Sequence, residues 1–114
     1  MVKLIPTLVK VLHSGNKILA DVGHQAIKGV LNTVENLSGL KSILEVLLHE
    51  LEKSKSGHVH HRLSTYLYQV LCDKTHLLKR GQSVNDVVSA YMKESLTSTN
   101  PDCRQVARRA LLIW

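Results

Sequence analysis

The chain has few aromatic residues and no long apolar run. Only 4% of its 114 residues are aromatic, and none of them is Phe. Leu, Val and Ile must therefore fill any core, as is typical of helices packed in layers. No apolar stretch reaches the roughly 18 residues of a membrane-spanning helix, and residues 1–6 lack the pattern of a signal peptide. We therefore expect a cytoplasmic chain with no membrane partner.

Cysteine and proline are equally sparse, with two residues of each. Cys72 and Cys103 lie far apart, and each falls within a helical pattern. This arrangement favours buried free thiols in a reducing compartment over a disulfide. Pro6 and Pro101 fall where helices are expected to begin, so their missing N–H groups cost little.

Signatures of catalysis are missing as well. Ser, His and Asp all occur, but there is no nucleophile elbow, phosphate-binding loop or pair of catalytically spaced carboxylates. We therefore expect no enzyme, no catalytic residue and no cofactor. His58 and His61 share a helix face and could hold Zn²⁺ with further ligands. Because no other residue offers those ligands at a clear spacing, the sequence predicts no metal site.

What the chain does contain is a unit of about 41 residues that recurs three times. Each unit turns a corner in a short basic or polar loop, at residues 13–17, 53–58 and 97–102. An apolar helical pattern precedes and follows each corner. A fixed period of this length, built on helix pairs, is the signature of a HEAT or armadillo solenoid. We therefore predict an all-α protein, an α-α superhelix (HEAT-repeat solenoid) of three antiparallel helix pairs.

Apolar residues at i, i+3 and i+4 spacing place six helices. They are expected at about residues 2–13, 16–34, 38–53, 58–73, 84–97 and from Pro101 to the stripe that ends at Trp114. Residues 73–82 are expected to be the longest connection. The predicted N-caps are polar side chains that accept bonds from free backbone N–H groups. They are Asn16, Ser38, Ser83 and Asn100.

These helices form a single domain in the prediction, and its repeats cover about residues 1–36, 37–80 and 81–114. Gly23 and Gly29 are expected to permit close helix contact. The chain is apolar up to its last residue, whereas solenoids close with polar capping repeats. We therefore expect a piece of a longer array, with other HEAT repeats as neighbours.

The corners resemble those of a known family. Segments along most of the chain are similar to HEAT repeats of a TOG domain, and the last is an acidic turn followed by Arg-x-x-Ala-Arg. These segments are residues 4–8, 14–17, 26–27, 54–56 with 61–62, and 99–110. In their order, the three corners resemble the carboxyl half of a TOG domain from the cytoplasmic linker-associated proteins (CLASP).

This resemblance implies a non-catalytic module that binds tubulin or microtubules and regulates microtubule dynamics in the cytoskeleton. In that family the turns within the helix pairs line one narrow edge, which meets an acidic partner surface. By position, the resemblance implies contact roles for Asn16, Lys17, Lys55, His58, Arg62, Asn100 and Arg104. Arg108 has two interpretations: it contacts the partner, or it braces the neighbouring repeat by bonding to acidic groups.

The chain departs from the family in two respects. It has only three repeats, and the first repeat of the family, which carries an aromatic tubulin contact, has no counterpart here. Where the family tends to have consecutive Arg, this chain has His60-His61-Arg62. Because His is mostly neutral near pH 7, these residues imply a weaker basic site.

The formal net charge of +6 independently indicates an acidic partner. A generic HEAT scaffold for another acidic protein is the alternative to a tubulin-binding module. Nucleic acid is a less favoured partner, because basic residues such as Arg104, Arg108 and Arg109 are not interleaved with aromatic residues. The basic residues also recur once per repeat instead of forming one dense patch.

Overall fold

A computed structural model describes residues 4–78 and 82–113, and every element of regular secondary structure in these ranges is a helix. The prediction of an all-α protein is therefore confirmed. The elements are α1 (Leu4–Leu12), α2 (Lys17–Thr33), α3 (Leu37–Lys53), α4 (Gly57–Asp73), α5 (Thr75–Leu78), α6 (Gln82–Leu96) and α7 (Pro101–Ile113). Three expected features lie outside the described residues. They are the outer ends of the first and last repeats at residues 1 and 114, the repeat boundary at 80–81, and Trp114.

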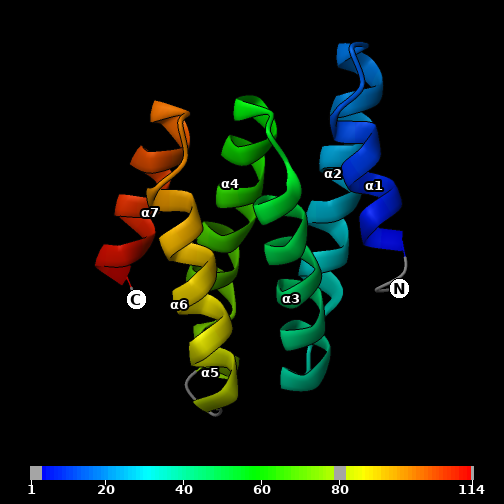
Figure 1. The fold of residues 1–114 in the computed structure, drawn as a ribbon. Coiled ribbons are helices and arrows are strands. Elements are labelled where there is room, and N and C mark those ends of the chain that lie inside the picture. The colour runs from blue at the N-terminus through cyan, green and yellow to red at the C-terminus, as the bar shows by residue number, and fades with distance from the viewer. Residues whose placement is uncertain (1–3, 79–81, 114) are drawn as a thin grey trace.

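The helices lie in two layers (Figure 1). One layer contains α1, α3 and α6, and α3 packs against both of the others. The second layer contains α2, α4 and α7, and α4 packs against both of its neighbours. Each helix of the first layer is joined to one of the second by a short turn, and the three turns lie at the same edge of the molecule.

Leu, Ile and Val make up most of the core, as expected from the scarcity of aromatic residues. Two Tyr side chains are also fully buried, Tyr66 on α4 and Tyr91 on α6. The Tyr91 hydroxyl donates a hydrogen bond of 2.6 Å to the carbonyl of Leu63 on α4. A buried phenol needs such a partner, so Tyr91 joins the two layers by a polar contact as well as by packing.

The caps predicted at Asn16 and Asn100 are confirmed. Asn16 Oδ1 accepts from the amide of Ile18 at 2.9 Å, and Asn100 Oδ1 accepts from the amide of Cys103 at 3.0 Å. The prediction of Ser38 as a cap is wrong, because α3 begins at Leu37 and Asn36 caps it instead. The prediction of Ser83 as a cap is also wrong, because α6 already begins at Gln82.

The connection at residues 73–82 contains the short helix α5, which was not predicted from the sequence. One further expectation, the burial of both cysteines, needs correction. Cys103 is buried and its thiol lies 3.5 Å from the carbonyl of Ser95, but Cys72 is exposed. Leu71 takes the core-facing position at this end of α4, and the next residue is turned away by about 100°. Both cysteines are free thiols, as predicted.

The two glycines of α2 differ in their surroundings. A Cβ atom on Gly23 would lie 3.0 Å from Val11 Cγ1 and 3.2 Å from the carbonyl oxygen of Leu8. Gly23 therefore permits the close approach of α1 and α2, as predicted. Gly29 has nothing within 4 Å of such an atom, so it permits no comparable contact. None of the helices in the described ranges combines the length and apolar character needed to cross a bilayer.

The glycine pair provides a test of this packing. We predict that Gly29→Ala raises the free energy of unfolding by about 0.5–1 kcal/mol, because Ala loses less backbone entropy in a helix. Gly23→Ala should lower it by about 1 kcal/mol, because α1 must move away from α2. Urea unfolding of both variants measures the difference. Equal stabilisation by the two substitutions would contradict the close approach of α1 and α2.

Candidate protein-binding edge

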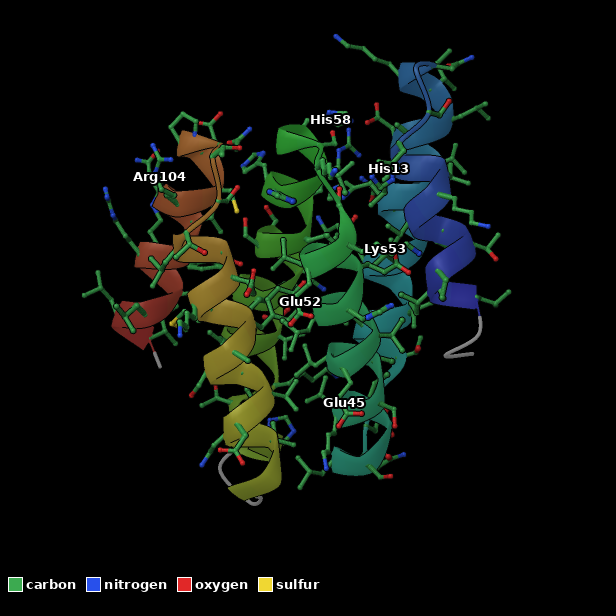
Figure 2. All side chains as sticks on the ribbon, viewed as in Figure 1. His13, Glu45, Glu52, Lys53, His58 and Arg104 are labelled. Carbon is green, nitrogen blue, oxygen red and sulfur yellow. The ribbon has the colours of Figure 1, made fainter. Side chains whose placement is uncertain are left out.

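The three turns that join the layers form the candidate site, and we call them the turn edge. It consists of residues 13–16, 54–56 and 97–100, which lie between α1 and α2, α3 and α4, and α6 and α7. Figure 2 shows His13, His58 and Arg104 near this edge, whereas Glu45 lies toward the opposite end of α3. The corners predicted from the sequence are therefore brought together along one side.

Histidine–serine contacts join the first turn to the second. The ring of His13 lies 3.0 Å from the carbonyl of Val9 through Nδ1 and 3.0 Å from Ser54 Oγ through Nε2. A carbonyl only accepts, so Nδ1 carries a proton, and Nε2 of the neutral ring accepts from the serine hydroxyl. The ring of His58 follows the same rule, with Leu12 as the carbonyl partner at 3.4 Å and Ser56 as the hydroxyl partner at 2.8 Å.

A third histidine joins the second turn to the third. His60 Nε2 donates to the carbonyl of Ser54 at 2.6 Å, and its Nδ1 lies 2.8 Å from Ser98 Oγ. The side chain of Asn100, in the third turn, also lies against the start of α4, since a Cβ atom on Gly57 would be 3.1 Å from Asn100 Nδ2. The three turns are thus fixed relative to one another by side-chain contacts, which makes the edge a row of set spacing.

Several contacts between the first two helix pairs join residues one sequence period apart. His13 and Ser54 are 41 residues apart, as are Asp21 and Arg62. His24 contacts Tyr66 across 42 residues. These contacts between the first two helix pairs are therefore separated by about the period found in the sequence.

Two of the predicted contact residues are exposed lysines. Lys17 begins α2 and Lys55 lies in the second turn. Among the described residues neither side chain makes a hydrogen bond or an ion pair. Asn16 is also exposed, but its side chain caps α2, and the half-buried Asn100 caps α7. The lysines are therefore available to a partner, whereas the two asparagines also have a structural role.

Three other predicted residues are engaged within the protein. Arg62 is half-buried and bonds to Asp21 Oδ1 at 2.8 Å and to the carbonyl of Ala20 at 3.3 Å. It therefore braces α4 against α2. Arg104 donates to the carbonyl of Ser98 at 2.8 Å. His58 bonds within and between turns as described above.

Arg108 is exposed and makes no ion pair with any residue in the described ranges. It therefore braces no acidic group within these ranges, and its contact with a partner stays a prediction. Arg62 instead makes the kind of contact that was considered for Arg108, because it bonds to Asp21 of the neighbouring helix pair.

A hollow of about 460 Å³ opens between the first turn and the start of α4. It is lined by Ser14, Gly15, Lys17, Ala20, His58, His61 and Arg62. Every ionisable residue of this lining is basic. His61 was not among the predicted contact residues, although its position three residues after His58 places both on one helix face. No group of three metal-ligating side chains forms within the part of the chain that the structure describes.

A half-buried histidine on α2 contacts α4 beside Arg62. His24 Nδ1 is 2.7 Å from the hydroxyl of Tyr66, and burial lowers the pKa of His24, with Arg62 and Lys28 adding to the effect. The hydrogen bond from Arg62 lowers the pKa of Asp21. Burial raises the pKa of Tyr66 above its usual value. At neutral pH the two helices therefore meet through a neutral imidazole–phenol pair and a charged arginine–aspartate pair.

Comparisons with known protein families, with curated proteins and with solved structures find no match to this chain. The resemblance to a TOG domain therefore depends on the short motifs alone. The geometry of the turn edge is an independent ground on which a function can be inferred.

The lowered pKa of the half-buried His24 predicts a pH dependence of stability. The pKa of His24 in the folded state lies below its unfolded value, so the unfolded chain binds protons more readily. This contribution to stability is present above about pH 6.5 and is lost as the pH falls below it. We predict that His24→Gln reduces the loss of stability between pH 7.5 and 5.5, measured by urea unfolding. The exposed His76 serves as control, and His76→Gln should leave the loss unchanged.

Proposed function

We propose that this chain is a HEAT-type repeat module that binds an acidic protein surface through its turn edge, and that its partner is tubulin or microtubules. The observation that carries the proposal is the fixing of three polar and basic turns in one row by His13, His58 and His60. Because the three turns are already held at fixed distances from one another, they need not become ordered when a partner binds. This reduces the entropy lost on binding.

The arrangement of the helices supports the HEAT assignment. Each helix pair packs on the next, and the layers and turns keep the same order along the molecule. Stacked helix pairs of this kind present extended surfaces to other macromolecules. The resemblance of the corners to those of TOG domains supports tubulin as the partner, because that family binds tubulin through the same turns.

Charge supports an acidic partner surface. The net charge is +6. Lys17 directly follows the first turn and Lys55 lies in the second, and both are exposed with no internal partner in the described ranges. Such exposed cations mainly raise the association rate and select a partner of opposite charge. Their contribution is screened by salt, so binding is expected to weaken as ionic strength rises.

Charge reversal at the turn edge tests the proposal. We predict that the double variant Lys17→Glu, Lys55→Glu weakens co-sedimentation with microtubules by about tenfold or more at low salt. Lys28→Glu, on α2 but outside the turn edge, is the matched control and should bind nearly as the unaltered chain does. Size-exclusion chromatography with free tubulin separates binding to the heterodimer from binding to the lattice.

Two outcomes would count against this function. If the double variant and the Lys28→Glu control bind equally, the turn edge is not the contact surface. If the unaltered chain binds neither microtubules nor free tubulin, tubulin is not the partner.

A further inference from the structure

The basic hollow beside the first turn has the form of a site for one acidic side chain. We propose that it takes the carboxylate of an aspartate or glutamate of the partner, with Lys17 and His61 as the residues that bind it. This inference rests on the proposed function, because it names the point on the turn edge where an acidic surface is held. It also gives a role to His61, which was not among the predicted contact residues, although it belongs to the His60-His61-Arg62 run where the family tends to have consecutive Arg.

The lining divides into engaged and available groups. The Arg62 guanidinium is bonded to Asp21 and to the carbonyl of Ala20. Both ring nitrogens of His58 have partners, at Ser56 and Leu12. These two side chains shape the hollow and contribute positive charge, but a ligand would have to compete for their hydrogen bonds.

Lys17 and His61 have no such internal bonds. Among the described residues, neither the ammonium of Lys17 nor the ring of His61 takes part in a hydrogen bond or an ion pair. Lys17 is exposed and His61 is half-buried, and they line the hollow from α2 and α4 respectively. A carboxylate between them can accept from the ammonium of Lys17 and from an N–H of the His61 ring, and hydrogen bonds that involve charged groups are the stronger kind.

The hollow has room for an acidic side chain. Its volume of about 460 Å³ lies within the range of sites that take whole small molecules. The small residues Ser14 and Gly15 are part of its lining, and a Cβ atom on Gly15 would have nothing within 4 Å. The space beside Gly15 is therefore open. An acidic side chain can enter while the rest of the partner stays on the turn edge.

The charge of His61 makes this site sensitive to pH. The ionisable groups around it are Lys17, Asp21 and His24 on α2, and His58 and Arg62 on α4. Lys17 and Arg62 are cationic, and Asp21 is paired with Arg62. A bound carboxylate adds the negative charge that favours protonation of His61. Binding should therefore take up a proton, and the affinity should rise as the pH falls through the range in which histidine titrates.

The test uses a synthetic oligoglutamate peptide and fluorescence anisotropy at pH 7.5 and pH 6.0, with ionic strength held constant. The peptide carboxylates stay largely ionised at both values. We expect binding about fivefold tighter at pH 6.0 for the unaltered chain. His61→Gln should bind with less than about a twofold difference between the two pH values. His49→Gln, at an exposed position on α3, is the matched control and should keep the full difference.

Two more variants keep the outcome decisive. His61→Lys places a permanent cation in the hollow, so binding should be tight at pH 7.5 and nearly independent of pH. Lys17→Gln should weaken binding at both pH values by a similar factor. Circular dichroism at both pH values establishes that each variant is folded.

The two proposals fail in different ways. In one outcome the unaltered chain binds the peptide, the Lys17→Glu, Lys55→Glu variant does not, and His61→Gln keeps the full pH difference in affinity. The carboxylate site is then overturned while the turn edge stands. If microtubules bind but the peptide does not, the carboxylate site is likewise overturned alone. If neither binds, both proposals are overturned.

Discussion

The burial of α4 is the constraint on which the rest of the structure depends. This helix packs against α2, α3, α6 and α7, and its apolar face is buried along its whole length. The N-terminal end of α4 carries His58, His60, His61 and Arg62. The bonds that His58 and His60 make at the turn edge, and part of the lining of the basic hollow, therefore depend on how α4 is packed. The burial of its apolar face and the polar contacts at its start are two results of the same packing.

The two fully buried tyrosines restrict how the helices pack, because their hydroxyls need polar partners. Tyr66 and Tyr91 are buried, and each points its hydroxyl at a polar group of another helix, His24 on α2 and the Leu63 carbonyl on α4. Aliphatic side chains pack well in many positions, whereas a buried hydroxyl is stable only where it finds a partner. These two bonds therefore help to set how α4 lies against the helices on either side of it.

Local chemistry explains what could be predicted from the sequence. Asn16 and Asn100 were recognisable caps because cap and helix lie within three residues, and the repeat period correctly located the three turns. The start of α3 was misplaced because Asn36 and Ser38 are both good caps and only packing selects between them. The engagement of Arg62 with Asp21 had no local signal, although their separation of 41 residues equals the period. The role of His61 required the hollow itself, which forms only when α2 and α4 meet.

The histidines differ in how they respond to a proton, and their surroundings explain why. His13, His58 and His60 each donate to a carbonyl through one nitrogen and face a serine hydroxyl with the other. A hydroxyl can donate or accept, so these bonds can form in either protonation state. His24 is partly buried beside Arg62 and Lys28 and resists a charge, whereas His61 faces an open basic hollow. We therefore expect acidification to act on stability through His24, whereas the contacts of His13, His58 and His60 can persist.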